Sequence, residues 1–387
     1  MKHFSYLNTA AAVIGSYRGS QPFHLFIKEF FRQDKKYGSR DRKQITHLCY
    51  CYFRLGKSAG HKPVQQAMSE AVFLCAAGPG ELLEAINPEW NALAMLPLVK
   101  KCAVLQIDPA SLHLFPQAGP LSQGIDPHDF TLSHLIQPDV FIRVRPGCHA
   151  TVQTALQKAA IRFTAVDQQC ISMPAATKVE AVIQLNKEAV IQDYSSQQTG
   201  ALMLTAAGNG PLHQVWDCCA ASGGKSILAK DSLDNIELTV SDIRSSVLNN
   251  LKKRFTEAAI KNYTLLQADL TKPTSNQLHL HFDLVIADAP CTGSGTWGRT
   301  PERLSYFDRK EIDHYSQLQQ KIVTSVIPCI KNGGYLLYIT CSVFKKENEE
   351  IVDFIRGDSN MQLLQTEVLK GYTMKADTMF AALFRKR

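Results

Sequence analysis

The stretch DCCAASGGKS, Asp217 to Ser226, follows a short apolar run and decides the fold of the second half of the chain. The run HQVWD (213–217) is typical of a strand, and Gly223 and Gly224 allow the backbone to come close to a ligand. A helix that begins behind these glycines presents free N–H groups at its N-terminus. The stretch therefore predicts a strand, a tight turn and a helix start that together hold a cofactor.

Four more apolar runs with the character of strands follow, and helical stretches separate them. They are ELTVSD (237–242), TLLQAD (264–269), FDLVIAD (282–288) and GGYLLYIT (333–340). Strands that alternate with helices predict a parallel sheet covered on both faces. Ligands in such sheets bind beyond the carboxyl ends of the strands. We therefore expect four strand-end acids to line one crevice: Asp217, Asp242, Asp269 and Asp288.

Three cofactor classes use a glycine turn of this kind. A nucleoside-triphosphate loop, G-x-x-x-x-G-K-[ST], fits at residues 224–226, but Cys219 stands where its first glycine belongs. A dinucleotide turn, G-x-G-x-x-G, needs separated glycines, and here the two glycines are adjacent. S-adenosylmethionine needs the turn, an acid for the ribose hydroxyls and a further acid near the adenine. Asp242 and Asp269 stand at those strand ends, so the ordered set favours S-adenosylmethionine.

The composition is that of an ordinary soluble globular protein, with 387 residues, 45% of them hydrophobic and 20% charged. No stretch reaches the roughly 18 apolar residues of a membrane span, and the N-terminus does not read as a secretory signal. The 11 cysteines include no C-x-x-C pair. This spacing favours neither a zinc site nor a disulfide framework, so we expect a reduced cytoplasmic protein without a metal.

The positive charge is concentrated at the N-terminus. Residues 1–60 hold 11 lysines and arginines against 3 aspartates and glutamates, which gives this segment a net charge of +8. The whole chain has a net charge of +7, so the other residues sum to about −1. A basic segment ahead of a near-neutral body predicts a polyanion as partner, RNA or DNA in the first place. The alternative is a solvated helical surface without a partner.

The first third of the chain has the apolar spacing of helices. FHLFIKEFFRQ (23–33) and ITHLCYCYFRLG (45–56) place apolar residues three and four positions apart, and a basic turn is expected between them at 35–44. The segment 106–137 is rich in proline, glycine and histidine and is expected to be a connector.

A small α+β module is expected next. VFIRVR (140–145) predicts a strand, TVQTALQKAAI (151–161) a helix and VEAVIQL (179–185) another strand. The sequence thus predicts three domains, which are a helical domain, the small α+β module and a catalytic domain, at residues 1–125, 138–200 and 201–387.

Two strands end in a cysteine motif, which indicates the chemistry. IADAPCTGSG (286–295) and YITCS (338–342) place Cys291 and Cys341 at the same edge of the sheet. Carbon 5 of a pyrimidine becomes nucleophilic when a thiolate adds to carbon 6, and a neighbouring acid stabilises the charge of the adduct. Asp288 with either cysteine meets that need, and the residues alone do not separate the two thiols.

These motifs, in this order, resemble the RsmB/Sun (Fmu) and NOL/NSUN-type RNA cytosine-5 methyltransferases. The resemblance extends from Asp139 to the C-terminus and includes VIQDYSSQQTGALM (190–203), SDIR, QADL, GGYLLYITCSVFKKENEE and TMFAALFRKR (378–387). It implies an α/β, Rossmann-like S-adenosylmethionine methyltransferase domain whose parallel sheet has an antiparallel edge strand. An RNA-recognition-like α+β module and an all-helical NusB-like N-terminal domain would precede it.

The resemblance also implies roles for individual residues. Cys341 in the TCS motif would be the nucleophile, Cys291 in the PC motif would assist release of the RNA, and Asp288 and Lys225 would contact the base or the reacting centre. Lys225 near a thiol would also favour the thiolate. The residues implied to bind the cofactor are Cys219, Ala220, Ala221, Ser222, Gly223, Gly224, Lys225, Asp242, Asp269 and Asp288.

The implied substrate is RNA, with ribosomal RNA first. From the sequence itself we expect a monomer, because no interface stripe is evident, and no membrane partner. Transfer RNA as substrate, and a non-catalytic RNA-binding assembly factor with the same fold, are the alternatives. SRDRKQITHLCYCYFRLGK (39–57) carries the NusB-like resemblance, and its cations would contact phosphates. Phe141 and Phe163 are candidate base-stacking residues, with burial in a core as the alternative.

The chain departs from the family pattern in four places. Ser222 replaces a proline of the cofactor turn, and Val247 stands where an arginine is common. The strand motif RVN reads RVR at 143–145, and the late motif DGFF reads DTMF at 377–380. The first two departures put cofactor contacts in question, and the last two concern the fit of RNA.

Overall fold

The computed structural model describes residues 2–34, 36–272, 281–357 and 360–387. The described chain divides into two compact units. One unit comprises 1–118, 126–137 and 297–308, and the other comprises 119–125, 138–296 and 309–387. No helix in the described ranges combines the length and the apolar character that crossing a membrane requires.

The first unit is helical. Its elements are α1 (Lys2–Ser16), α2 (Phe23–Gln33), α3 (Ser39–Arg54), α4 (Val64–Cys75), α5 (Glu81–Ile86), α6 (Pro88–Ala92), α7 (Leu98–Val104), α8 (Pro127–Ser133) and α13 (Arg303–Tyr306), with 3₁₀ turns at Gly56–His61 and Pro109–Ser111. The helix predicted at 23–33 is confirmed. The turn predicted at 35–44 is wrong in its second half, because α3 begins at Ser39, where Asp41 accepts from the N–H of Gly38. The expected connector 106–137 contains α8.

One cation of the NusB-like stretch is structural. Arg54 ends α3 with only 2% of its surface exposed. Its guanidinium donates to the carbonyl oxygens of His134 at 2.7 Å and Gly298 at 2.9 Å, and to the Gln137 side chain at 2.5 Å. Arg54 therefore joins three segments of the helical unit, and the expectation that it contacts a phosphate is wrong.

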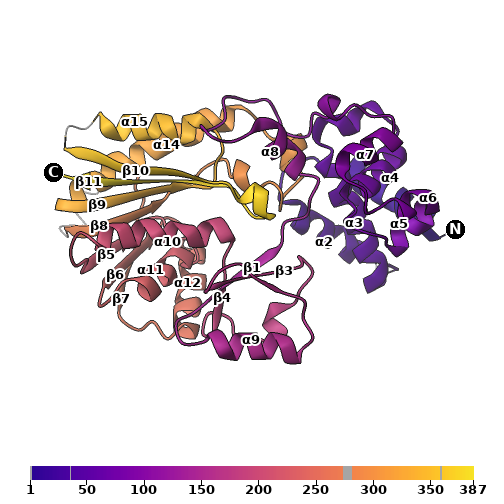
Figure 1. Cartoon of the computed structure of the whole chain (residues 1–387). Coiled ribbons are helices and arrows are strands. Elements are labelled where there is room, and N and C mark those ends of the chain that lie inside the picture. The colour runs from indigo at the N-terminus through magenta and orange to yellow at the C-terminus, as the bar shows by residue number, and fades with distance from the viewer. Residues whose placement is uncertain (1, 35, 273–280, 358–359) are drawn as a thin grey trace. The chain divides into compact units, whose positions relative to one another are not determined.

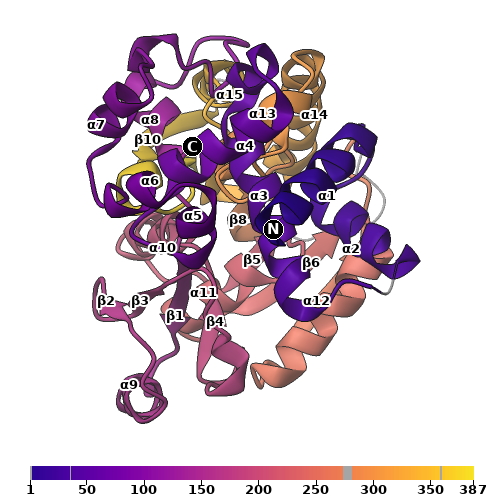
Figure 2. The same cartoon turned by 90° about the vertical axis from the view of Figure 1, so that its right-hand side faces the viewer.

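The second unit begins with a small sheet. β1 (Val140–Val144), β2 (Thr164–Ala165), β3 (Cys170–Met173) and β4 (Ala189–Ile191) pair antiparallel in the order β2-β3-β1-β4. Helix α9 (His149–Lys158) contributes Val152 and Leu156 to the core of this module. Figure 2 shows α9 below β1 and β4. The strand predicted at 179–185 is wrong: Val179–Ala181 forms a 3₁₀ turn, and its alternating apolar residues Val179 and Ile183 instead fill the small core.

Phe141, a candidate for stacking on a base, is also buried in a core. It is 2% exposed, and its ring lies 6.0 Å from that of Tyr194. A ring buried in this way cannot stack on a base, so that prediction is wrong for Phe141. Phe163 is partly buried and packs against the small core.

The large sheet carries the remaining elements. The strands are β5 (Gln214–Asp217), β6 (Glu237–Asp242), β7 (Tyr263–Gln267), β8 (Phe282–Asp288), β9 (Ile330–Thr340), β10 (Met361–Leu369) and β11 (Met379–Lys386). The helices are α10 (Tyr194–Ala207), α11 (Gly224–Ser232), α12 (Ser245–Glu257), α14 (Lys310–Val326) and α15 (Glu349–Arg356).

The strand order is β10-β11-β9-β8-β5-β6-β7, and the strands from β9 to β7 are parallel. β11 runs antiparallel between β9 and β10, one place in from the edge. The predicted Rossmann-like fold is confirmed, and β10 adds an outer strand beyond the antiparallel one.

Two helical layers cover the sheet. Figure 1 shows α10, α11 and α12 over one face and α14 and α15 over the other. Each face has its own apolar core, with Leu202, Ile227 and Phe255 in one and Ile322 and Ile351 in the other. Because both faces are buried, polar groups that follow the strands gather at the edge where the parallel strands end.

Candidate active site

A cavity of about 550 Å³ lies at the carboxyl ends of the parallel strands. Its walls come from the turn after β5, the ends of β6 and β8, the segment after β7, helix α14 and the end of β9. The lining residues are Cys218, Cys219, Ala221, Asp242, Ile243, Arg244, Ala268, Asp269, Leu270, Thr271, Asp288, Ala289, Pro290, Cys291, Tyr315, Leu318, Ile322 and Cys341.

Seven of the predicted site residues lie in this wall: Cys219, Ala221, Asp242, Asp269, Asp288, Cys291 and Cys341. The predicted residues Ala220, Ser222, Gly223, Gly224 and Lys225 do not line the cavity, and neither does Asp217. Its side chain is fully buried below the turn, and the hydroxyl of Ser226 donates to its Oδ2 at 2.5 Å. The expectation that all four strand-end acids line one crevice is therefore wrong for Asp217, because the turn after the central strand β5 closes over it. Asp242, Asp269 and Asp288 do line the cavity.

The glycine turn has the tight geometry that the sequence predicts. Gly223 adopts a left-handed φ of +86°, and a Cβ there would lie 2.7 Å from the Phe255 ring. Gly224 then begins α11. Ala220 lies in the core behind the turn, whereas Ala221 faces the cavity and its N–H donates to Asp242 at 3.2 Å. The turn and the end of β6 are thus joined at the cavity.

Ser222 makes a contact that proline could not make. Arg254 of α12 donates through Nη1 to the Ser222 carbonyl oxygen at 3.0 Å and to its hydroxyl at 2.9 Å. This pair of hydrogen bonds holds the turn where the family pattern has a rigid ring. Val247 lies on α12 and is not part of the cavity wall.

Asp242, the acid predicted for the ribose hydroxyls, ends β6 and lies in the cavity wall. It is 6% exposed, and Arg244 donates to it from the backbone and from Nε at 2.9 and 3.0 Å. Burial alone would raise the pKa of Asp242, but these hydrogen bonds lower it. Asp269 accepts from the Thr271 hydroxyl at 2.6 Å, and this hydrogen bond contributes most to its lowered pKa. Both acids are therefore ionised acceptors at neutral pH.

The two predicted cysteines, Cys291 and Cys341, lie close together just after the carboxyl ends of β8 and β9. Their Sγ atoms are 3.3 Å apart, and each thiol is half-buried. The contact with Cys341 and burial raise the pKa of Cys291 well above its ordinary value. This raised pKa favours the protonated thiol at Cys291, and either sulfur can be the donor in the contact between the two.

Gly295 joins the two cysteine segments. Its N–H donates to the Cys341 carbonyl oxygen at 2.9 Å, and its own carbonyl accepts from the Thr378 N–H at 2.9 Å. A Cβ at this position would lie 1.9 Å from the Thr378 oxygen. Only glycine permits this approach, so the GSG of the first motif fixes the distance between the thiols.

Glu347 supports both cysteine segments from below. Its buried carboxylate accepts from the Thr292 N–H at 2.8 Å and the Thr292 hydroxyl at 2.6 Å, and also from the Ser342 hydroxyl. Burial raises its pKa although these hydrogen bonds oppose the shift. Asn348 adds a hydrogen bond to the Ser342 carbonyl oxygen at 2.9 Å. The residues after the second motif therefore hold the loops that carry the thiols.

Lys225 and Asp288 form an ion pair beside the thiols. The Lys225 Nζ lies 3.1 Å from Asp288 Oδ2 and 2.7 Å from the hydroxyl of Ser196. The lysine side chain is 6% exposed and the aspartate side chain 31%. A buried cation is thus held against an acid that faces the cavity.

Sequence reasoning missed three parts of the site. Arg244 pairs with Asp242, and Ser196 of α10 contacts Lys225. Tyr315, Leu318 and Ile322 form a wall from α14. Their spacing of three and four places them on one face of a helix, a signal that was available. The contact of Ser196 had no such signal, because it joins helices separated by a strand.

The cavity thus has two ionised acceptors, Asp242 and Asp269, in its wall. The Cys291 and Cys341 thiols and the Asp288 carboxylate, which pairs with the Lys225 ammonium, lie close together at its edge. This arrangement suits a nucleophilic addition by sulfur next to a bound cofactor that offers hydroxyl donors.

A family model described as 16S rRNA methyltransferase RsmB/F matches residues 202–384. Ribosomal RNA small subunit methyltransferase B of Escherichia fergusonii is 32% identical over 181 residues, which cover 46% of this chain and 40% of that protein. The protein of the same name from Erwinia tasmaniensis has the same identity and coverage. The matched region thus spans about 40% of the length of these curated relatives.

Solved structures share the fold at lower identity. The structure titled PH0851 aligns over 95% of both chains with a TM-score of 0.68 and 20% identity. A methyltransferase homologue from Pyrococcus horikoshii covers 67% of this chain and 90% of its own, with a TM-score of 0.57 and 19% identity. NSun6 from Pyrococcus horikoshii, solved with SFG, covers 64% and 91%, with a TM-score of 0.53 and 15% identity.

Proposed function

We propose that residues 202–384, which match the family model described as 16S rRNA methyltransferase RsmB/F, form an S-adenosylmethionine-dependent methyltransferase domain of that family, and that the chain methylates carbon 5 of a cytosine in RNA. Ribosomal RNA is the first candidate substrate, since the matching relatives are named for it. The observation that carries the proposal is the pair of thiols 3.3 Å apart beside Asp288, at the end of the cofactor cavity.

The cavity fits the methyl donor. Its volume of about 550 Å³ and its wall of small residues at the glycine turn leave room for an adenosine and an amino-acid chain. Asp242 would accept from the ribose hydroxyls, and Asp269 would lie near the adenine. When bound, S-adenosylmethionine supplies an electrophilic methyl group that carbon 5 of the base takes.

The thiols act in sequence. The Cys341 thiolate bonds to carbon 6 of the ring, ring nitrogen 3 takes up a proton delivered through Asp288, and carbon 5 of the resulting neutral adduct is nucleophilic. After methylation a base removes the carbon 5 proton, and the bond from Sγ to carbon 6 breaks. Cys291, whose raised pKa keeps a proton on sulfur, assists this release. Lys225 holds Asp288 in place.

The other parts of the chain would bind the RNA around the target base. We propose that the helical unit acts as a NusB-like domain through the exposed cations of α2 and α3, such as Lys28, Arg32 and Lys43, which are solvent-exposed. The small sheet of β1 to β4 would serve as the RNA-recognition-like module. Phosphate contacts of this kind position an RNA without selecting its sequence.

Labelled methyl transfer to RNA, measured with two cysteine variants, tests the proposal. Cys341→Ala is expected to lose methyl transfer, and Cys291→Ala is expected to accumulate an RNA–protein adduct that survives denaturing electrophoresis. Wild-type rates in Cys341→Ala would reject the assignment of the nucleophile, and Cys291→Ala free of RNA would reject the release role.

Bisulfite sequencing of total RNA with and without the gene identifies the substrate. The proposal expects a lost 5-methylcytosine in ribosomal RNA. A loss confined to transfer RNA would move the substrate to that class, and methyl transfer to no RNA at all would leave the assembly-factor alternative.

A further inference from the structure

A chain of hydrogen bonds leads from the catalytic ion pair to the small sheet. Lys225 Nζ donates to the Ser196 hydroxyl at 2.7 Å, and the Gln192 Nε2 donates to the same oxygen at 3.1 Å. The Gln192 Oε1 in turn accepts from Nε of Arg143, on β1, at 2.9 Å. The chain is largely buried, with Gln192 6% and Arg143 2% exposed.

The chemistry of each group determines which atom donates and which accepts along this series of hydrogen bonds. A guanidinium can only donate, so Arg143 obliges Gln192 to turn its oxygen toward it. The amide nitrogen of Gln192 then faces Ser196 and donates to the hydroxyl oxygen. The Ser196 oxygen is thereby an acceptor with one further lone pair, which the ammonium of Lys225 occupies.

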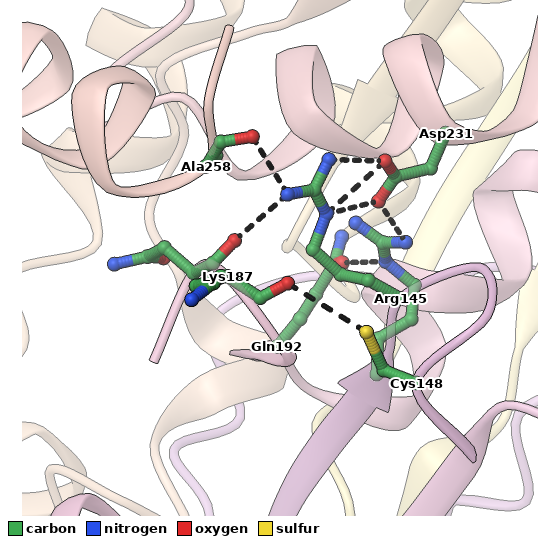
Figure 3. A network of polar contacts seen from close by, with 8 residues as sticks. Arg145, Cys148, Lys187, Gln192, Asp231 and Ala258 are labelled. Carbon is green, nitrogen blue, oxygen red and sulfur yellow. Dashed lines mark hydrogen bonds and ion pairs between the residues drawn. The ribbon is translucent and has the colours of Figure 1, made fainter. Parts of the chain in front are cut away.

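The far end of the chain is anchored in a buried ionic cluster. Arg143 Nη1 and Arg145 Nη2 each lie 2.7 Å from the Asp231 carboxylate at the end of α11. Arg145 also donates to the carbonyl oxygens of Ala258 at 2.7 Å and Asn186 at 3.0 Å. Figure 3 shows the Arg145 guanidinium facing Asp231, with Gln192 beside the cluster. The cluster includes Arg145, where the family pattern has an asparagine.

This end of the chain is rigid because its members are fixed from several sides. The Asp231 side chain is 7% exposed and accepts from two arginines. Parallel hydrogen bonds between arginine and carboxylate fix orientation as well as distance. Lys225, by contrast, has a long flexible side chain, and an ion pair to a partly exposed Asp288 alone leaves its direction loosely defined.

We propose that Ser196 and Gln192 are positioning residues for the methylation reaction, which fix the Lys225 ammonium against Asp288. The inference rests on the proposed function, because it assigns Asp288 to the target base. Two hydrogen-bond acceptors then define the direction of Nζ, one in the cavity wall and one at the start of α10. The ionic cluster of Arg143, Arg145 and Asp231 is the rigid end of this series of hydrogen bonds, and it sets the orientation of the Gln192 amide.

The test compares two serines that are adjacent in sequence. Ser196→Ala removes the acceptor of Lys225, whereas Ser195→Ala removes a buried hydroxyl whose hydrogen bond goes to the Leu369 carbonyl oxygen at 3.4 Å. The rate of RNA adduct formation, measured in a Cys291→Ala background, should fall roughly ten-fold in Ser196→Ala, as for loss of a hydrogen bond to a charged group. It should stay near the parent rate in Ser195→Ala.

Two further variants separate positioning from folding. Ser196→Thr keeps the hydroxyl and should restore most of the rate. Gln192→Glu has the same shape and can still accept from Arg143, but an ionised carboxylate cannot donate to Ser196. The Ser196 hydroxyl can turn to donate to the new carboxylate and still accept from Lys225, so Gln192→Glu should slow the reaction less than Ser196→Ala does, and the double variant should be no slower than Ser196→Ala alone. Melting temperatures should stay within a few degrees of the parent.

An adduct that forms equally fast in Ser196→Ala and Ser195→Ala would overturn the inference. A Cys291→Ala parent that accumulates no adduct would reject the release role of Cys291 instead. The inference is then judged on methyl transfer by the single variants, where a lower kcat at an unchanged KM for RNA in Ser196→Ala supports it. An equal kcat in Ser196→Ala and Ser195→Ala overturns it.

Discussion

At the scale of single residues, the strand-end acids have different environments and therefore different charges. Asp242 and Asp269 are held ionised by hydrogen bonds. Burial raises the pKa of Asp217 to about 7, although the Ser226 hydroxyl opposes this. Asp217 Oδ1 has no hydrogen-bond partner among the described residues. A carboxyl in such a site is more stable protonated than charged.

This environment makes stability depend on pH. The folded pKa of Asp217, about 7, lies above the unfolded value near 4, so the folded state holds the proton longer. The contribution is fully present below about pH 4 and is lost as pH rises to about 7, with a total of a few kcal/mol at most. We expect Asp217→Asn to remove this loss, seen as a smaller decrease in the free energy of unfolding between pH 5 and 8.

Asp283→Asn is the control, because the pKa of Asp283 is lowered in the folded state whereas that of Asp217 is raised. Burial alone would raise the pKa of Asp283, but Lys331 and the N–H groups of Gln214 and His213 lower it. Its contribution is therefore lost as pH falls below about 4. Identical pH profiles for wild type and Asp217→Asn in urea unfolding would contradict the assigned environment.

The sequence predicted where the site residues at the strand ends lie, but it did not predict which side chains form hydrogen bonds with them. Cys291, Cys341 and Asp288 could be placed together because parallel strands end at one edge. The contact of Ser196 with Lys225 could not, because it depends on how α10 packs against α11. Arg54 was misread for the same reason: a cation on a basic helix gives no sequence signal that it is buried.

At the scale of elements, the small sheet is joined to α11 by charge. Arg143 of β1 and Arg145, which follows this strand, both pair with one buried aspartate, Asp231. The sequence predicted β1, α9 and the five parallel strands, since their apolar patterns are clear. It did not predict β10, whose apolar residues alternate imperfectly and whose middle is exposed. The strand at 179–185 failed because alternation also fits residues packing from a 3₁₀ turn.

The ionic cluster should therefore carry much of the stability of this region. Asp231→Asn keeps the shape of the side chain but leaves Arg143 and Arg145 without a counterion, and removing one partner of a buried ion pair costs about 3–5 kcal/mol. Urea denaturation measures the loss. Asp353→Asn is the control, because its pair with Arg356 is exposed and should contribute less than about 1 kcal/mol. Equal effects of the two variants would contradict this role of the cluster.

At the scale of the whole molecule, charge and chemistry lie in different parts of the chain. The family match is confined to residues 202–384, whereas the net charge of +8 lies in residues 1–60. The sequence predicted both features from composition and motifs. It could not predict that the segment 297–308, which follows the first cysteine motif, belongs to the helical unit, because that assignment depends on long-range packing.

The basic segment should give RNA binding a strong dependence on salt. Lys28 and Arg32 are exposed on α2. Removing both with alanine should weaken binding to all RNA sequences alike and reduce the slope of log K against log salt by about 2. Filter binding over a salt series measures this slope. Lys252→Ala with Arg356→Ala, on α12 and α15, is the matched control, and an equal change in both pairs would contradict a binding role for the N-terminal segment.

The most direct test of the account is to locate the covalent bond. Cys291→Ala protein is incubated with RNA and S-adenosylmethionine, denatured, digested with nuclease and trypsin, and analysed by mass spectrometry. The account predicts a methylated cytidine nucleotide on the peptide between Lys331 and Lys345, attached to Cys341. A nucleotide attached to any other residue, or no modified peptide while methyl transfer proceeds, would contradict it.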